Sequence, residues 1–126
     1  RFALGRLARW YEAVEQSALL MVDKIKGIAG NYPFICVGDF NSLPDTEQIV
    51  KISAFLNDAY LVTEQPPYGP EGTSYGFKLS APMKHRIDYI FVSNQINMLK
   101  YGALTDFYKQ RFPSDHIPII LLIRIL

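Results

Sequence analysis

Apolar residues recur at three- and four-residue spacing along the first quarter of the chain. Between residues 7 and 29 they are Leu7, Trp10, Val14, Ala18, Met21, Val22, Ile25 and Ile28. This spacing is the period of an amphipathic helix. Gly30 and Asn31 end the predicted helix, and Pro33 prevents its continuation. The apolar run over residues 34–37 then predicts a buried strand, so the chain opens as a layered α/β fold does.

A second helix and several strands are predicted further along. Asp45 or Thr46 caps this helix at its N-terminus. Its apolar positions are Ile49, Val50, Ile52 and Leu56. Proline and glycine residues between residues 63 and 72 predict an exposed loop. Strands are predicted over residues 73–77, 86–93 and 117–126, with a weaker one over residues 96–104.

Composition narrows the function classes. The chain has 126 residues, 49% of them hydrophobic, and its 13 basic and 12 acidic residues leave a net charge of +1. We expect one compact domain that cannot hold a polyanion by charge alone. The single Cys36 excludes a disulfide framework, and no apolar run approaches the roughly 20 residues of a membrane span, so we expect a soluble chain. The start at Arg1 leaves the compartment open and suggests that an upstream segment is missing.

Three polar clusters interrupt the apolar runs at or inside the predicted strands. They are Asp39 with Asn41, Arg86 with Asp88, and Asp115 with His116. Residues two apart in an extended segment face the same way, so the members of each of the first two clusters can point into one site. Carboxylates beside a histidine supply ligands for a hard cation, a group that orients water and a donor to charged oxygens. Hydrolysis of a phosphate ester needs these three functions.

Each cluster also has a plainer interpretation. Asp39 and Asn41 suit an Asx turn after a strand, and the segment around His116 suits a cap or an edge loop. Asp88 is harder to dismiss, because a carboxylate inside an apolar strand is costly to bury unless it is paired. Arg86 and His116 are both candidate partners for it.

Taken in order, the clusters resemble the C-terminal motifs of the endonuclease/exonuclease/phosphatase superfamily, metal-dependent phosphoesterases related to the DNase I-like nucleases. The motifs are Gly-Asp-Phe-Asn-Ser at residues 38–42, Arg-Ile-Asp-Tyr-Ile-Phe at residues 86–91 and Ser-Asp-His-Ile-Pro-Ile at residues 114–119. The segment Thr-Ser-Tyr-Gly-Phe at residues 73–77 is similar to a stretch common in bacterial members. The resemblance covers about residues 17–126.

The resemblance implies a role for each matching residue. Asp39 orients or deprotonates the attacking water and Asn41 helps to bind the phosphate. Asp115, together with Asp39, contributes to a site for Mg²⁺ or Mn²⁺. His116 hydrogen-bonds the phosphoryl oxygens, and Asp88 holds the histidine in orientation and favours its cationic form. Tyr75 and Arg86 are further candidates for substrate contact.

The resemblance also implies a fold class, namely α/β, as half of a four-layer α/β sandwich with a mixed, largely antiparallel sheet and helices on one face. Residues 1–126 would form a single domain, the C-terminal half of the family's domain, with residues 1–14 as a divergent junction. The family's other metal ligands belong to the half that this chain lacks. Since the sheet face left by that half would be apolar, we expect either a homo-oligomer through this face or origin from a larger protein.

We therefore interpret the chain as a metal-dependent phosphoesterase that cleaves P–O bonds by activated water. The resemblance implies a phosphorylated substrate, which is a nucleic acid, a nucleotide, a sugar or inositol phosphate, or a phospholipid head group. Near-neutral charge argues against long duplex DNA. The alternative is a catalytically silent fragment or binding module that keeps the fold without holding the metal.

Overall fold

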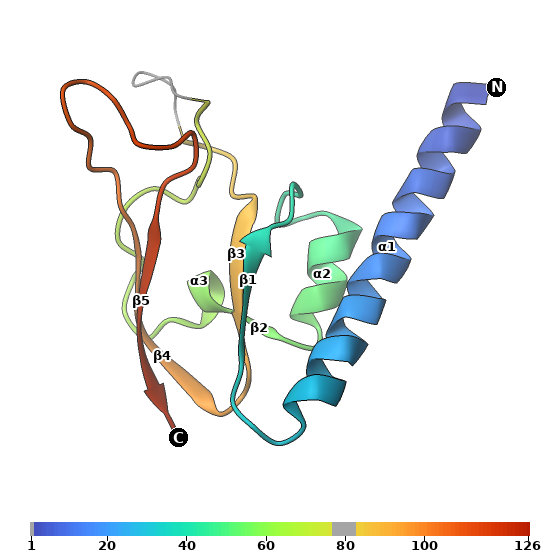
Figure 1. The fold of residues 1–126 in the computed structure, drawn as a ribbon, viewed down its shortest axis with the longest axis horizontal. Helices are drawn as coiled ribbons and strands as arrows, with labels where there is room; N and C mark the ends of the chain where they lie inside the picture. The colour runs from blue at the N-terminus through green and yellow to red at the C-terminus, as the bar shows by residue number, and fades with distance from the viewer. Residues whose placement is uncertain (1, 77–82) are drawn as a thin grey trace.

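The computed structural model describes residues 2–76 and 83–126, and the side chains of α1 from residue 12 onward, except residues 14 and 15. Helices α1 (Phe2–Ala29) and α2 (Glu47–Ser53) pack together on one side of the molecule, and the N-terminal half of α1 projects beyond α2 (Figure 1). Thr46 is the N-cap of α2, one of the two candidates expected, although its side chain makes no capping bond there.

The helices cover one face of a three-stranded antiparallel sheet, whose strand order is β1-β3-β2. Its strands are β1 (Ile35–Asp39), β2 (Asn57–Asp58) and β3 (Asp88–Val92). Side chains from both helices, from β3 and from the segment just after α2 form the core beneath it: Ala18, Val22, Ile49, Ile52, Leu56, Tyr89 and Phe91. Cys36 packs against this core, as expected for a small apolar side chain. The prediction of a buried strand is wrong for the rest of β1, whose other residues are exposed because helices cover only one face of the strand.

A second sheet pairs β4 (Ile96–Ala103) with β5 (Ile119–Ile125), also antiparallel, with an irregularity between Met98 and Lys100. The short helix α3 (Ala59–Val62) lies between the two sheets (Figure 1). The second core cluster fills the same space, and includes Ala59, Val92, Met98, Tyr101, Ala103 and Ile117. The molecule therefore has three layers, with helices outside a central sheet and a two-stranded sheet on the other side.

This architecture confirms the predicted α/β class, with antiparallel strands and helices on one face. The segment at residues 73–77 departs from the prediction, because only Ser74 forms β-bridges and Phe77 lies outside the described residues. β2 and α3 were not predicted, since elements of two and four residues carry no periodic signal. Ile28 is 87% exposed although its spacing placed it on the apolar face of α1.

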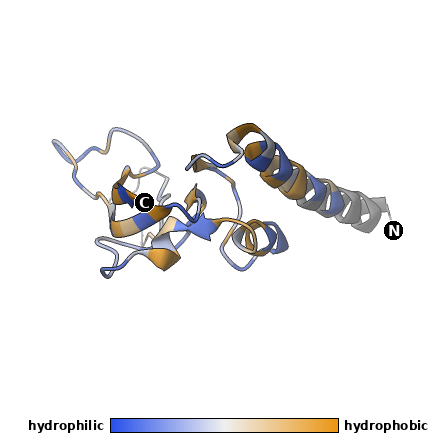
Figure 2. Ribbon diagram, turned by 90° about the horizontal axis from the view of Figure 1, so that it is seen from below, coloured by the Kyte–Doolittle hydropathy of each residue, from blue (hydrophilic) through white to orange (hydrophobic). Residues whose placement is uncertain are grey.

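Hydrophobic and hydrophilic residues alternate along α2 and the described part of α1 (Figure 2). Several apolar side chains remain exposed on the strands, among them Ile35 and Val37 on β1 and Ile120 and Leu122 on β5. Of the helices formed by the described residues, none is long and apolar enough to cross a bilayer.

Candidate active site

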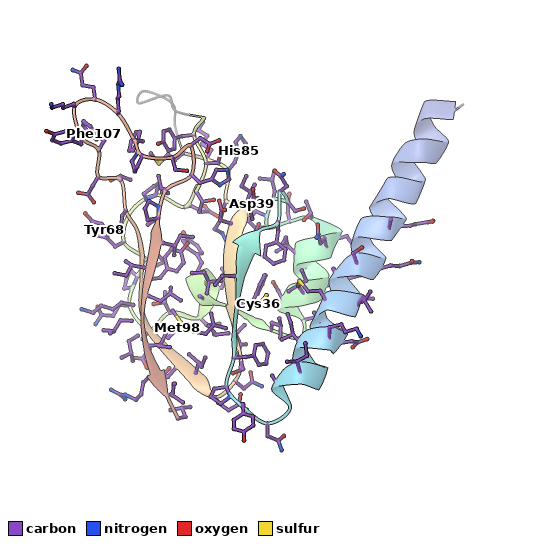
Figure 3. All side chains as sticks on the ribbon, viewed as in Figure 1. Cys36, Asp39, Tyr68, His85, Met98 and Phe107 are labelled. Carbon is purple, nitrogen blue, oxygen red and sulfur yellow. The ribbon has the colours of Figure 1, made fainter. Side chains whose placement is uncertain are left out.

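Strand pairing places the two aspartates of the site opposite each other. Asp39 ends β1, Asp88 begins β3, and the two are Cα partners in the antiparallel register. Figure 3 shows Asp39 at the end of β1, on the same side of the molecule as His85. In this register Cys36 of β1 packs against the helix-side core, and a slip of one residue would turn its side chain away.

His116 joins the two aspartates from a loop that precedes β5. Its Nδ1 lies 2.7 Å from Oδ2 of Asp88. One ligand atom from each of Asp39, Asp88 and His116 lies within 4.8 Å of the other two. Asp88 thus pairs with the histidine rather than with Arg86, which settles the choice that the sequence left open. Three segments far apart along the chain therefore converge on one cluster.

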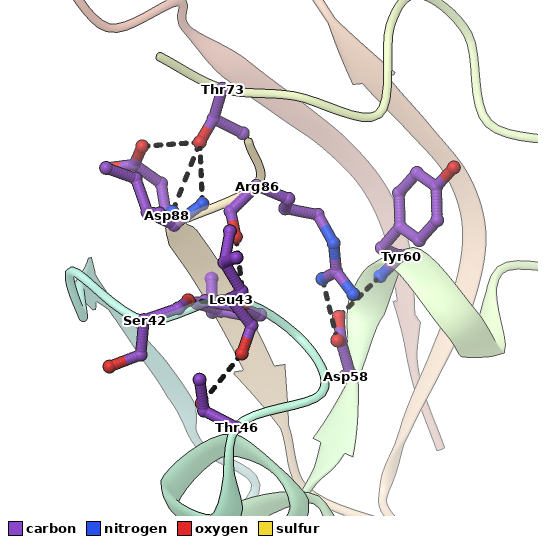
Figure 4. A network of polar contacts seen from close by, with 10 residues as sticks. Ser42, Leu43, Thr46, Asp58, Tyr60, Thr73, Arg86 and Asp88 are labelled. Carbon is purple, nitrogen blue, oxygen red and sulfur yellow. Dashed lines mark hydrogen bonds and ion pairs between the residues drawn. The ribbon is translucent and has the colours of Figure 1, made fainter. Parts of the chain in front are cut away.

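The Asp88 carboxylate has a second partner that sequence reasoning did not single out. The hydroxyl group of Thr73 donates to Oδ2 of Asp88 at 2.6 Å, and the side chain of Thr73 is fully buried (Figure 4). The only hint of this partner in the sequence was that Thr73 begins the segment at residues 73–77 that resembles bacterial family members. The spacing of residues along the chain does not show where the hydroxyl group of Thr73 points.

The charge on the His116 ring is favoured by its surroundings. The hydrogen bond to Asp88 raises the pKa of His116 above its ordinary value, and the negative charges of Asp88, Asp115 and Asp39 act in the same direction. Desolvation opposes them but does not prevail. The side chain is 29% exposed, so the ring remains accessible to a substrate while paired with Asp88. A cationic ring at this point suits an anionic ligand.

Asn41 follows β1 in a turn. Its backbone N–H donates to Oδ1 of Asp39 at 2.8 Å, and its φ of +50° is in the left-handed region that asparagine tolerates. The turn interpretation is therefore correct for this cluster, and it is compatible with a site: the turn holds the Asp39 carboxylate beside Asp88, and Asn41 itself is exposed.

Arg86 does not reach the cluster, although it lies two residues before Asp88. Its guanidinium group turns toward α3, where Nη1 donates to Oδ2 of Asp58 at 2.7 Å and the ring of Tyr60 lies against it (Figure 4). The side chain is 2% exposed. This position of Arg86 does not support the expected contact with substrate. The guanidinium group is buried and paired with Asp58, so it cannot reach a phosphate at the cluster.

Tyr75 is also buried, with its ring against that of Phe112. Its hydroxyl group donates to the backbone oxygen of Ser114, so it braces the turn before His116 instead of facing the cluster. The backbone carbonyl of Asp115 accepts from the N–H of Tyr75 at 3.2 Å. The Asp115 side chain is not part of the three-residue cluster, although its charge influences His116.

A pocket of about 250 Å³ adjoins the cluster. Asp39 and Asp88 lie at its polar end, and the apolar side chains of Val37, Ile90 and Ile119 line the remainder. A larger pocket of about 840 Å³ is lined by residues between 106 and 113, on the loop that carries Phe107 (Figure 3), and the cluster residues do not line it. The smaller pocket can bring a reacting group to the cluster.

The cluster fits a hard divalent cation in part. Oδ1 of Asp39 accepts the Asn41 N–H, and the exposure of this side chain makes its other carboxylate oxygen accessible to a cation. Oδ2 of Asp88 is already bound by Thr73 and His116. Since Mg²⁺ in enzymes commonly takes one or two carboxylates and keeps several water molecules, Asp39 is the residue of this cluster that best suits it.

The chain is similar in sequence and in fold to known proteins. Residues 3–116 match the profile of the Endonuclease/Exonuclease/phosphatase family. The fold is similar to that of the mannosyl-6-phosphatase of Bacteroides thetaiotaomicron VPI-5482, with a TM-score of 0.84 and 31% identity over 90% of this chain and 46% of that chain. No curated protein matches the chain.

Two further solved structures share the fold. A functionally unknown conserved protein from Enterococcus faecalis V583 has a TM-score of 0.81 and 26% identity, over 92% of this chain and 46% of that one. The human Nocturnin catalytic domain, solved with a sulfate anion, has a TM-score of 0.68 at 22% identity, over 93% and 42% of the two chains, and this likeness concerns the fold alone. The chain thus spans about half the length of the solved structures it matches.

Proposed function

Since the chain belongs to the endonuclease/exonuclease/phosphatase family, we propose that it hydrolyses phosphoric esters with an activated water molecule at the cluster of Asp39, Asp88 and His116. The observation that carries the proposal is the convergence of these three side chains, from three separate segments, within 4.8 Å of one another. Phosphoryl transfer depends on positioning and charge neutralisation more than on a covalent nucleophile, and this cluster supplies both.

His116 binds the phosphoryl oxygens through the ring nitrogen opposite the one that meets Asp88. The Asp88 carboxylate holds the proton on Nδ1 and stabilises the cationic ring, so that the donor is in place as negative charge develops. Asp39, more exposed, orients the attacking water or accepts its proton. Asn41 lies beside Asp39 and contributes an amide group to the phosphate.

We propose that Asp39 holds a divalent cation, Mg²⁺ or Mn²⁺, at this end of the sheet. Asp115 is the second proposed ligand, because it is the aspartate of the Ser-Asp-His motif at residues 114–116 that the family resemblance assigns to the metal site. When bound, the cation would neutralise phosphate charge and lower the pKa of a coordinated water molecule. The chain's own residues still bind the ester and orient the water.

A sugar phosphomonoester is the substrate class we propose to test first. The support is the similarity to a mannosyl-6-phosphatase at 31% identity. The net charge of +1 agrees with a small anionic substrate better than with long duplex DNA. Nucleotides, inositol phosphates, phospholipid head groups and short nucleic acids are the comparison substrates.

Activity is tested by assaying mannose 6-phosphate, a generic phosphomonoester and a generic phosphodiester, with Mg²⁺ and with EDTA. We expect metal-dependent turnover that falls at least about 100-fold in Asp39→Ala and His116→Ala. Asp106→Ala, an exposed aspartate outside the cluster, is the control and should retain wild-type turnover. Turnover unaffected by both cluster substitutions would refute the site. No turnover with any substrate would favour a catalytically silent module.

We also propose that a second copy of the chain covers the face of β5 that carries Ile120 and Leu122, which are 57% and 52% exposed. Apolar side chains gathered on a strand face are rarely left in water, and the solved relatives have about twice the length with which to cover theirs. Light scattering after size exclusion should show dimers that Leu122→Lys disrupts. A monomer at high concentration would contradict this proposal.

A further inference from the structure

The hydroxyl group of Thr73 uses its full hydrogen-bonding capacity at the base of the site. Its oxygen accepts the backbone N–H groups of Ile87 and Asp88, each at 3.2 Å. Its proton goes to Oδ2 of Asp88 at 2.6 Å (Figure 4). A hydroxyl group has one donor and two acceptor sites, so the two amides fix the direction in which Thr73 donates. The O–H bond points at the carboxylate because both lone pairs are occupied.

The same carboxylate oxygen receives the His116 ring. Oδ2 of Asp88 lies 2.6 Å from Oγ1 of Thr73 and 2.7 Å from Nδ1 of His116, both short distances of the kind found when the acceptor is charged. Two donors that converge on one oxygen restrict the rotation of the carboxylate. Since this oxygen accepts from both partners, Nδ1 of His116 carries a proton, and Nε2 is the ring nitrogen left to meet a substrate.

The backbone of Thr73 is tied to both sides of this pair. Its N–H donates to the carbonyl of His85 at 3.0 Å, just before the segment that leads into β3. Its carbonyl accepts the N–H of Ile117 at 2.9 Å, next to His116. Thr73 therefore lies between the segment that carries the aspartate and the loop that carries the histidine, and it is fully buried there.

We propose that Thr73 is a positioning residue of the hydrolytic site, whose hydroxyl group sets the angle at which the Asp88 carboxylate holds His116. Its effect on turnover rests on the proposed function, whereas its effect on the His116 ring does not. Thr73 touches neither substrate nor metal in this proposal. It acts through Asp88, as residues that orient a charged histidine partner do elsewhere.

The decisive variant is Thr73→Val, which keeps the shape of the side chain and removes the hydroxyl group. Thr73→Ser restores the hydroxyl group and is the rescue variant. Thr63→Val is the matched control, because Thr63 Oγ1 is a buried hydroxyl oxygen that has no hydrogen-bond partner among the described residues. All three are made in the full 126-residue chain, with His116→Ala to assign the ring signals.

The first measurement is the proton spectrum of the His116 Nδ1–H, which a hydrogen bond to a carboxylate moves downfield and protects from exchange. We expect this signal in wild type, Thr73→Ser and Thr63→Val, and its loss or upfield shift in Thr73→Val. An unchanged signal in Thr73→Val would overturn the proposal, and so would an equal loss in Thr63→Val. If Thr73→Val fails to fold, the wild-type chain decides: a slowly exchanging Thr73 hydroxyl proton supports the proposal and a freely exchanging one overturns it.

The second measurement is steady-state turnover. Thr73→Val should lower kcat about 10-fold with KM within about twofold of wild type, because the phosphate contacts remain while the ring is misoriented. Thr73→Ser should recover most of kcat. If the wild-type chain shows no turnover, the proposed function fails and the ring signal alone decides the role of Thr73.

Discussion

The buried ion pair between Arg86 and Asp58 allows a quantitative test of how the fold is held together beneath the site. The two side chains are 2% and 3% exposed, and their charged atoms lie 2.7 Å apart. Asp58 also caps α3 by accepting the backbone N–H of Tyr60 at 3.0 Å. Asp58→Asn removes the negative charge and keeps an oxygen for the cap. The guanidinium group is then left buried without a counter-charge.

The magnitude follows from this burial. Removing one partner of a buried pair costs about 3 to 5 kcal/mol, because the remaining charge is neither hydrated nor compensated. The ring centroids of Tyr60 and Tyr89 lie 4.6 and 4.7 Å from the guanidinium carbon of Arg86. Both rings are retained in the variant, so they do not contribute to the difference in the free energy of unfolding between variant and wild type. Asn still offers an acceptor, so we expect about 3 kcal/mol, against a total stability of about 5 to 15 kcal/mol for a domain.

The assay is urea unfolding followed by circular dichroism. The free energies of unfolding of the variant and the wild type are compared with the same dependence on urea concentration for both. The double variant Asp58→Leu with Arg86→Met should recover much of the loss, since an apolar pair removes the desolvation cost. Glu47→Gln is the exposed control, because the Glu47–Lys51 pair in α2 is solvated, and it should cost at most about 0.5 kcal/mol. A loss below about 1 kcal/mol in Asp58→Asn would refute the reasoning.

Two further predictions concern pH and backbone packing. Because the hydrogen bond to Asp88 raises the pKa of His116, this pair stabilises the fold fully below the ordinary histidine pKa of about 6.5, and the contribution is lost as pH rises through the raised pKa. Urea unfolding across this range should show the decline in wild type, and a similar decline in His116→Ala would contradict it. Gly72→Ala should lower the free energy of unfolding by about 1 to 3 kcal/mol, because the new Cβ would lie 2.1 Å from the backbone oxygen of Met83. In Gly27→Ala, within α1, the new Cβ meets nothing within 4 Å, so this variant should raise the free energy of unfolding by about 0.5 to 1 kcal/mol. Equal effects in melting experiments would contradict the packing argument.

The long elements could be predicted because their signal is local. The first helix, the strand before Asp39 and the strand through Asp88 all have periodic or continuous apolar runs, and the structure contains all three. Family motifs also indicated that Asp39, Asp88 and His116 belong together, and their side chains do converge. Their catalytic roles remain predictions.

Other features depend on contacts that no local pattern encodes. The apolar spacing of α1 includes Ile28, but α2 covers only part of the helix and Ile28 remains 87% exposed. In the predicted strand at residues 73–77, Ser74 is the only one of the described residues 73–76 that forms β-bridges, and these pair it with His85 and His116 from two other segments. β2 and α3 are too short for any period to appear in their sequence.

The sequence by itself determined the α/β class, the positions of the long helices and strands, and the residue types gathered at the strand ends, because hydrophobic period and turn chemistry act over a few residues. Only the tertiary structure decided which partner each polar side chain took. Arg86 turned to Asp58, 28 residues away, and Asp88 met Thr73 and His116 from 15 and 28 residues away. Hydrogen bonds of that kind depend on how separate layers pack, and packing is a property of the whole chain.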